Sequence, residues 1–425
     1  MHLNKPYNSA KLPRISLGHL VMFLIWPFAV FVRSLRRYRI PQSKTIFWLF
    51  CIYFGLVFIV AENYVGSADS ARYALQLKEL HRESFSFSAL VELIYSEVGY
   101  VDIYQPLLTW IVASFTNNPK VLFALFAAVF GFFYVQNLWM VLNSKQIRFS
   151  PLLFLFVLAL ALTNPIWNIN GARMWTATHI FLYGVLHIYL NQNKKGYLWA
   201  AASILVHFSF LFPVALLIAY AFIPKNATIL FVFFVSTSFV NEINYEGLRE
   251  VLGFLPETFQ PRVRGYTNEQ YAEQMRASIE ELSWHVRFAD YCQKFVLYLW
   301  TILAFAFYDK WSKNLPKIKN LFLLGLFIGG FAKIAGLVPS GGRFLVLSNF
   351  IFCMVFIFLI AEFTVFRFKV QWAKQITYLP LTFYLIFAFR TGMDYYGPLL
   401  FVGNPLFALV MDDQIPLIEF IKSVF

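Results

Sequence analysis

Long apolar runs recur along this chain and are separated by short polar loops. The runs occupy residues 15–32, 45–61, 119–142, 150–163, 171–190, 196–223, 227–240, 292–308, 320–337, 344–366 and 376–389. A helix needs about 20 mostly apolar residues to cross the hydrocarbon core of a bilayer, and most of these runs approach that length. The pattern therefore predicts an all-α polytopic membrane protein, with residues 1–425 as a single integral membrane domain of about 11–13 transmembrane helices.

Strongly basic loops predict which helix ends face the cytoplasm. These loops are residues 33–39, 144–148, 191–196, 309–319 and 367–374. Cytoplasmic loops of membrane proteins are enriched in Lys and Arg, so we place all of them inside. The N-terminus is then expected outside, because more basic residues follow the first apolar run than precede it.

Two longer polar segments fall on the external face in this topology. The first, residues 62–118, contains a short apolar piece at 105–115, which is predicted to lie along the interface or to re-enter the membrane. The second, residues 241–291, has apolar side chains at helical spacing in its second half. This spacing predicts an amphipathic helix that lies on the membrane surface.

One apolar run must be interrupted for this topology to hold. If 196–223 and 227–240 each crossed the membrane once, the basic loop 309–319 would lie outside. A break near His207, shortly before Pro213, restores the expected sidedness, because proline removes a backbone hydrogen bond from a helix. Irregular backbone at membrane depth persists where it lines a wet cavity, so His207 is a candidate functional residue.

Composition supports the membrane assignment and excludes several classes of function. Hydrophobic residues make up 59% of the chain and charged residues 13%, whereas a soluble domain has about 25% charged residues. The net charge of +13 lies mostly in loops, where it sets topology, so no nucleic-acid partner is expected. Cys51, Cys292 and Cys353 lie in apolar runs and predict buried thiols. The sequence has no Gly-rich phosphate loop and no cluster with metal-ligand spacing, so we expect no cofactor and no bound metal.

Arginine dominates the basic residues of the external side in this topology, whereas the inside loops carry mostly lysine. The guanidinium group is a planar fork that binds phosphate or carboxylate through two hydrogen bonds. Arg173 and Arg343 flank helix ends within the apolar pattern, where a charged side chain is costly and its default interpretation is functional. The alternative is that external arginines pair with nearby acidic residues or with lipid headgroups.

Four short motifs follow one another in the first half of the chain. They are GSADSARY (66–73), SEVGYVDIYQPLL (96–108), NINGARMWTA (168–177) and LVHFSFLFP (205–213). In this order they resemble the G-T-D-Y-x-x-Y, E-x-G-Y, N-x-x-R-Q-x-x-A and H-x-S elements of EpsG-type exopolysaccharide polymerases, relatives of the Wzy O-antigen polymerases. Ser70 replaces the family's tyrosine and Met174 its glutamine. The second half of the chain resembles the family chiefly through GGRF (341–344).

This resemblance implies a glycosyltransferase on a GT-C-like scaffold. Such an enzyme joins oligosaccharide units carried on undecaprenyl diphosphate, at the periplasmic or external face of a bacterial inner membrane. Its product would be an O-antigen, a capsule or an exopolysaccharide. The implied partners are the lipid-linked oligosaccharide, membrane lipids and a chain-length regulator.

Candidate roles follow for the residues in and around these motifs. Arg173 and Arg343 are expected to bind the diphosphate, with Lys333 and Arg264 as lesser candidates, because arginines stabilise charge that develops on a leaving group. The candidates for the base, or for a group that orients the acceptor, are Asp69, Glu97 and His207. The candidate sugar contacts are Tyr73, Tyr100, Asn168 and Asn170. Alternatives stay open for two of these residues: Asp69 can cap the helix that follows it, and Glu97 can pair with an external arginine.

Other functions are compatible with a cationic cavity among many helices. A flippase or exporter of lipid-linked saccharides is one, although the polar groups gather at one face and no inverted repeat is evident. A membrane acyltransferase that modifies surface glycans is another, since intramembrane His and Arg would also be expected there. A ligase or a single-sugar transferase is a third.

Overall fold

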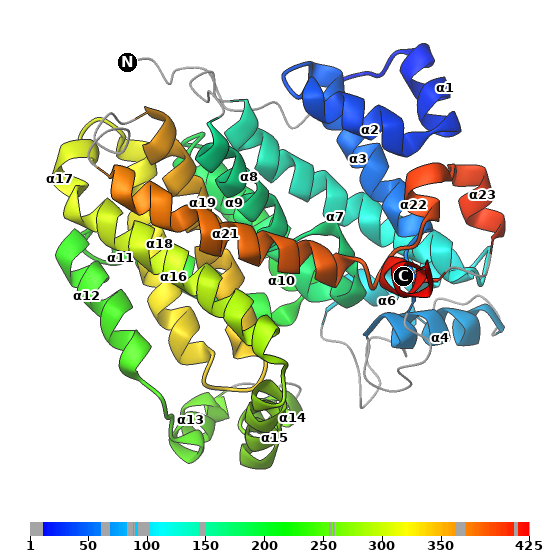
Figure 1. Ribbon diagram of the computed structural model, residues 1–425. Coiled ribbons are helices and arrows are strands. Elements are labelled where there is room, and N and C mark those ends of the chain that lie inside the picture. The colour runs from blue at the N-terminus through cyan, green and yellow to red at the C-terminus, as the bar shows by residue number, and fades with distance from the viewer. Residues whose placement is uncertain are drawn as a thin grey trace. The chain divides into compact units, whose positions relative to one another are not determined.

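The chain forms two compact units in the computed structural model. The structure describes residues 12–60, 69–82, 88, 90–91, 102–143, 150–254, 257, 260–362, 370–411 and 415–424. Unit 1 comprises Met1–Lys145, Asn164–Leu211 and Ala388–Phe425, and unit 2 comprises Gln146–Thr163 and Phe212–Phe387. Each unit is therefore assembled from segments that are distant in the sequence (Figure 1).

Helices make up both units. Those of unit 1 are α1 (Leu17–Ile25), α2 (Pro27–Arg36), α3 (Pro41–Leu56), α4 (Asp69–Arg82), α6 (Tyr104–Ala113), α7 (Pro119–Leu142), η1 (Ile166–Gly171), α9 (Ala172–Tyr189), α10 (Gly196–Val206), η2 (Phe208–Phe210), α22 (Leu399–Val402), α23 (Pro405–Val410) and α24 (Leu417–Val424). Those of unit 2 are α8 (Pro151–Thr163), α12 (Ala227–Ser236), η3 (Thr237–Phe239), α13 (Tyr245–Val251), η4 (Leu252–Phe254), α14 (Gln260–Tyr266), α15 (Glu269–Glu280), α16 (Trp284–Ala306), α17 (Tyr308–Trp311), α18 (Pro316–Ala335), η6 (Gly341–Phe344) and α19 (Leu345–Glu362). The helices α11 (Leu211–Phe222) and α21 (Gln371–Gly392) contain the boundaries between the units.

The predicted fold class, an all-α polytopic membrane protein, is confirmed. The described residues form no β-strand, and one isolated bridge joins Phe58 to Tyr396. The helical stretches among them that are long and apolar enough to cross a membrane are Pro119–Leu142, Pro151–Tyr189, Pro316–Ala335 and Gly341–Glu362. Shorter apolar helices cover Gly196–Val206, Phe208–Phe222 and Ala227–Phe239. The total of about 11–13 spans, the single membrane domain and the sidedness of the segments 62–118 and 241–291 stay predictions.

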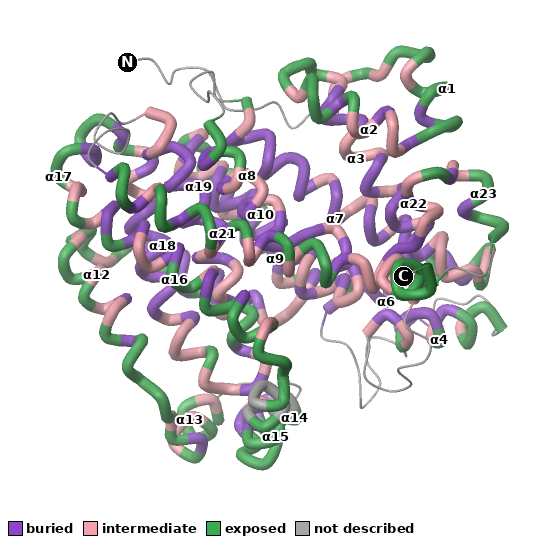
Figure 2. The backbone as a smooth tube through the Cα atoms, in the orientation of Figure 1, coloured by how far each residue is buried: buried purple, intermediate pink, exposed green. Residues whose placement is uncertain are grey.

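Close packing of α3 against α7 forms the core of unit 1. A Cβ atom on Gly55 would lie 2.5 Å from the Phe123 carbonyl oxygen, and one on Gly131 would lie 2.5 Å from the Cys51 Cβ. Glycine is needed at both positions because the backbones approach so closely. In unit 2, α19 is buried along most of its length, as α7 is in unit 1 (Figure 2).

The predicted break at His207 is present in the structure. Helix α10 ends at Val206, His207 is extended with φ −149° and ψ 115°, and η2 and α11 follow directly. Pro213 lies inside α11 and not at the break itself.

Two other apolar or amphipathic stretches are interrupted where the sequence analysis treated them as continuous. The first run, 15–32, is divided at Trp26, whose non-helical backbone (φ −146°, ψ 82°) separates α1 from α2. The expected amphipathic helix of the second polar segment ends at Glu280, and α16 begins at Trp284. The short apolar piece 105–115 forms α6, which at 10 residues is too short to cross a bilayer.

Candidate active site

Helix α9 begins at a tight turn that carries several of the predicted site residues. The preceding helix ends at Thr163, before Pro165, and the 3-10 turn η1 leads into α9 at Ala172. At the turn, a Cβ on Gly171 would lie 3.1 Å from the Trp175 ring and 3.5 Å from the Asp69 Oδ2 atom. A Cβ here would be tight only against the Trp175 ring, and the Asp69 carboxylate at the start of α4 lies within van der Waals range of the turn.

Arg173 lies in the first turn of α9 and forms an ion pair with a buried carboxylate. Its Nη1 atom donates to both carboxylate oxygens of Asp102, at 3.3 and 3.4 Å, and its Nε donates to the Tyr73 hydroxyl at 3.3 Å. The Asp102 side chain is fully buried, and that of Arg173 is 18% exposed. These contacts are longer than the usual 2.9 Å of such hydrogen bonds.

The cation of this turn is the Arg173 guanidinium. The 3-10 helix η1 runs directly into α9, so helical residues precede the first residue of α9. Asp69, which also pairs with Arg72, and the buried Asp102 are the carboxylates that balance this charge in the structure. The arrangement is suited to bind an anionic group while holding a carboxylate beside it.

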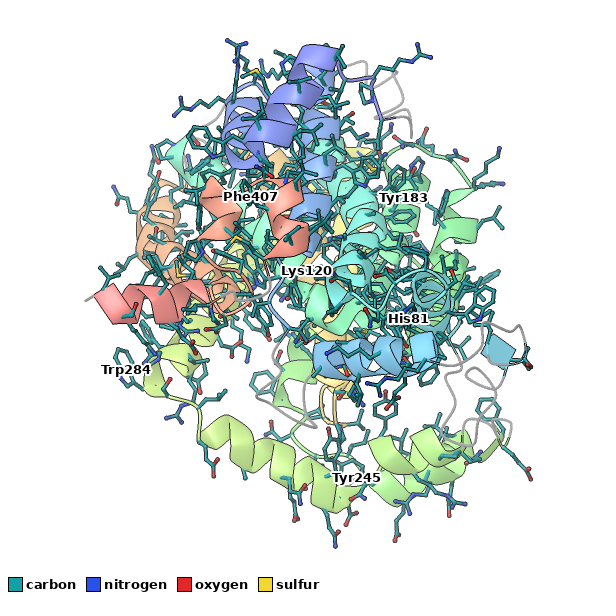
Figure 3. The ribbon with its side chains drawn as sticks, turned by 90° about the vertical axis from the view of Figure 1, so that its right-hand side faces the viewer. His81, Lys120, Tyr183, Tyr245, Trp284 and Phe407 are labelled. Atoms are coloured by element: carbon teal, nitrogen blue, oxygen red, sulfur yellow. The ribbon has the colours of Figure 1, made fainter. Side chains whose placement is uncertain are left out.

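Helix α4 is fixed in place from both ends. Tyr73 is buried, and its ring packs edge-on against Phe126 of α7 with centroids 5.7 Å apart. At the far end of α4, His81 Nδ1 lies 2.7 Å from the Ala113 carbonyl oxygen at the end of α6 (Figure 3). Helix α4, which carries Asp69 and Tyr73, is therefore packed against α7 near its start and bonded to the end of α6 at its far end.

A network of buried amides supports the turn before α9. Asn168 donates to the Asn164 side-chain oxygen at 2.9 Å, and the Asn164 amide donates to the Trp175 carbonyl at 2.9 Å. The His179 Nε2 atom is 3.0 Å from the Asn164 carbonyl oxygen, and Asn137 donates to the His179 carbonyl at 2.9 Å. Asn168, a predicted sugar contact, thus has a structural partner, and His179 is a packed, hydrogen-bonded histidine.

The tail of the chain reaches the same turn. Asn170, another predicted sugar contact, donates to the Tyr395 hydroxyl at 3.3 Å. The Tyr395 ring stacks on Phe58 with centroids 5.6 Å apart. Burial raises the pKa of the Tyr395 phenol, and the Asp394 carboxylate acts in the same direction, so the hydroxyl stays protonated and can donate to a ligand.

His207 lies at the same end of unit 1 as Arg173. Helices α9 and α10 are antiparallel and meet where a Cβ on Gly184 would lie 2.5 Å from the Gly196 carbonyl oxygen. From that contact Arg173 and His207 are each 11 residues away, or about 16 Å at the rise of an α-helix. The Ile103 N–H, next to Asp102, also donates to the Leu205 carbonyl at 3.0 Å. The structure therefore brings the Arg173–Asp102 pair and the break at His207 to one end of the unit.

The imidazole of His207 is oriented by its own turn. Its Nδ1 atom accepts a hydrogen bond from the Ser209 N–H at 3.3 Å and lies 3.0 Å from the Ser209 hydroxyl oxygen. With Nδ1 used as an acceptor in this way, the other ring nitrogen carries the proton in the neutral imidazole.

The other predicted cations belong to unit 2. Arg343 is exposed in η6, and Arg264 is exposed on α14. Lys333 donates to the Phe234 carbonyl at 2.7 Å and to the Ser238 hydroxyl at 2.8 Å, so it stabilises the end of α12. A joint role of Arg173 and Arg343 in binding a diphosphate stays a prediction.

Two predicted site residues, Glu97 and Tyr100, lie outside the described residues. Within the described part of the chain, no group of three or more His, Cys, Asp or Glu side chains is placed to hold a metal ion. The three cysteines are buried thiols, as expected.

Asp102 and Tyr395 are the site residues that the sequence analysis did not select. Asp102 lies inside the motif 96–108, just before the apolar piece 105–115. A carboxylate at that position in a motif is a signal that the sequence displays. Tyr395 had none, because its partner Asn170 is 225 positions away in the sequence.

The apolar spans and the charged cluster in a helical bundle define this protein as a polytopic helical membrane protein. Residues 21–401 match the sequence model of the EpsG family, and the chain belongs to that family. Membership indicates a function like that of a polysaccharide polymerase, acting on a lipid-linked saccharide in a membrane. Comparison with curated proteins and with solved structures gives no match.

Proposed function

We propose that this protein is a glycosyltransferase that polymerises undecaprenyl-diphosphate-linked oligosaccharide units at the external face of the bacterial inner membrane. The observation that carries the proposal is the cluster at the start of α9, where Arg173 lies beside the carboxylates of Asp69 and Asp102. The family supports the polymerase class and a lipid-linked substrate. The periplasmic location of the cluster rests on the distribution of basic loops.

The reaction needs a cation and a base in close proximity. The acceptor hydroxyl oxygen attacks the anomeric carbon of the donor sugar, the bond from that carbon to the diphosphate oxygen breaks, and the lipid diphosphate departs with the bonding electrons. In this scheme Arg173 stabilises the negative charge on the leaving diphosphate. Arg343, with Lys333 and Arg264 as lesser candidates, stays a diphosphate ligand predicted from the sequence.

A carboxylate or imidazole takes the acceptor's proton in this scheme. Asp69 is the strongest candidate within the described residues because its carboxylate is 28% exposed beside the start of α9. His207 is the alternative, and Glu97 remains a prediction from the motif alone. Asp102 is fully buried and paired with Arg173, which suits a positioning role. Asn170, Asn168 and the two tyrosines Tyr73 and Tyr100 are proposed to contact sugar hydroxyls.

The test is an elongation assay with the purified full-length protein. Undecaprenyl-diphosphate-linked oligosaccharide is added, and the products are sized on a gel. A ladder of longer chains supports polymerisation. One added sugar indicates a single-sugar transferase, and unchanged substrate on a folded protein that binds it favours transport.

Arg173→Lys is the informative variant in this assay. It keeps the charge that balances Asp102 but loses the planar fork, so the ladder should fall by about 10- to 100-fold, as expected for one lost hydrogen bond to a charged group. Arg249→Lys is the matched control, because Arg249 is bonded to Thr267 in unit 2 and lies outside the cluster. An unchanged ladder in Arg173→Lys would refute the assigned role of Arg173.

A further inference from the structure

The first two helices return the chain to the level from which it started. The Thr45 hydroxyl, in the first turns of α3, donates to the Pro13 carbonyl at 2.7 Å. Pro13 precedes α1 and Thr45 follows α2. Residues 14–44 therefore form a hairpin whose two ends are in contact. A segment that crossed the membrane once could not have its two ends in contact.

The hairpin is also too shallow to reach the opposite face. Its tip is Trp26, whose Nε1 donates to the Phe401 carbonyl of α22 at 2.6 Å. Helix α22 lies beside Tyr53 of α3, because the Tyr53 hydroxyl donates to the Leu399 carbonyl at 2.6 Å. The hairpin tip therefore reaches about as far along α3 as Tyr53. Tyr53 is eight residues beyond Thr45, or about 12 Å of α-helix, whereas the hydrocarbon core is about 30 Å thick.

Aromatic packing holds this hairpin against α3. The rings of Phe31 and Phe50 stack with centroids 3.9 Å apart, and Phe28 packs edge-on against Phe401 at 4.9 Å. The hairpin therefore shares an aromatic core with α3 and α22. Figure 1 shows α1 and α2 beside the first turns of α3, with α22 next to them in the same unit.

The surface of the hairpin is divided between apolar and cationic side chains. Leu17 is 77% exposed and Ile25 67% exposed, and most other α1 side chains are also exposed. The exposed arginines at and after the end of α2 are Arg33, Arg36, Arg37 and Arg39. An apolar helix followed by clustered arginines fits a membrane interface with anionic headgroups, since each basic residue near such a surface adds about 1 kcal/mol of attraction.

We propose that residues 13–45 form a half-depth hairpin that enters and leaves the bilayer on the same side, with its arginines bound to the anionic phospholipids of that leaflet. The N-terminus then shares a side with the basic loop 33–39. This reverses the external N-terminus expected from the sequence. It also places Arg14, at the start of the hairpin, on the side to which the positive-inside bias assigns the loop.

Cysteine labelling of the full-length protein tests the sidedness. Arg14→Cys and Arg37→Cys are introduced at exposed positions, and Asn117→Cys, in the loop before α7, marks the opposite end of α3 and α7. Each variant is treated with a membrane-impermeant maleimide in right-side-out and inside-out vesicles. The native thiols are buried and provide the unlabelled background. Labelling of Arg14→Cys and Arg37→Cys in one orientation and of Asn117→Cys in the other is expected. Labelling of Arg14→Cys together with Asn117→Cys would overturn the proposal.

Native mass spectrometry tests the lipid ligand independently of any transferase activity. The full-length protein is purified in detergent with added phosphatidylglycerol, and bound lipids are counted. The hairpin variant replaces four arginines by glutamine: Arg33→Gln, Arg36→Gln, Arg37→Gln and Arg39→Gln. The control removes equal charge from exposed lysines: Lys194→Gln, Lys195→Gln, Lys310→Gln and Lys313→Gln. Loss of bound phosphatidylglycerol in the hairpin variant alone is expected, and equal loss or no loss in both would refute the assigned ligand.

Discussion

Removing Arg173 should unfold part of unit 1 as well as abolish activity, because the buried carboxylate of Asp102 would lose its balancing charge. At 3.3 Å and an effective dielectric constant of 20, the attraction between the two groups is about 5 kcal/mol. Breaking a buried ion pair from one side costs about 3–5 kcal/mol in measured cases. Arg173→Ala is therefore expected to lose stability of this size, and a simple loss of activity in this variant would not identify a functional residue.

A second substitution separates the two effects. In Arg173→Ala/Asp102→Asn the buried charge is gone, so most of the lost stability should return. The activity should not return, since the cation that we assign to the diphosphate is still absent. Asp102→Asn alone should cost less than Arg173→Ala, because the partly exposed guanidinium keeps its contact with Tyr73.

The measurement is thermal denaturation of the full-length proteins in detergent, followed by size-exclusion chromatography, in parallel with the elongation assay. The expected order of stability is wild type, Asp102→Asn, the double variant and Arg173→Ala. Equal stability of Arg173→Ala and wild type would show that the ion pair does not support the fold. A full ladder from the double variant would show that Arg173 has no part in the reaction.

Other substitutions probe the tail, the break and the helix contact. Tyr395→Phe removes the hydroxyl that accepts from Asn170 and should cost about 1 kcal/mol, seen as a severalfold rise in KM with a smaller change in Tm. No change in KM would exclude Tyr395 from the site. His207→Ala removes a turn acceptor and its proton-transfer group, whereas His207→Asn restores the acceptor. If His207 is the base, we expect both variants to have about a hundredth of the wild-type activity. Only His207→Asn should recover the stability of the wild type. Gly184→Ala forces a Cβ to within 2.5 Å of backbone and should lower stability by about 1–3 kcal/mol in a melting experiment, whereas Gly18→Ala meets no atom within 4 Å and should not. Equal melting of the two glycine variants would contradict the close helix contact.

The long helices of this chain are predictable because residues at or next to their ends signal where they begin and end. The apolar run 119–142 coincides with α7, which starts at Pro119 after an Asn118 side-chain cap. Proline at the first helical position and a capping residue before it are signals that the sequence displays. The break at His207 was also found, although from the sidedness of a distant loop and not from a local signal.

The first apolar run shows why other limits were missed. Average hydrophobicity over 15–32 suits a spanning helix, but Trp26 adopts a non-helical backbone and Pro27 begins a new helix. Proline was visible in the sequence as a point of interruption. Whether a chain continues or turns back after such a point depends on its tertiary contacts, here those of Trp26 and Phe401.

The candidate site was predictable only as far as its motifs extend. Arg173 and Asn170 lie within one short motif, and Asp69 and Tyr73 within another. Their meeting depends on helix packing, and the partner of Arg173 lies 71 positions away. A contact between side chains so far apart in the sequence produces no periodic pattern, so a single sequence does not predict it.

The tight glycine contact holds α9 and α10 together, backbone against backbone, at Gly184 and Gly196. Arg173 and His207 each lie about 16 Å along their helices from that contact. The spacing of these two side chains therefore depends on two residues that carry no functional group, because a larger side chain at either glycine would push the helices apart.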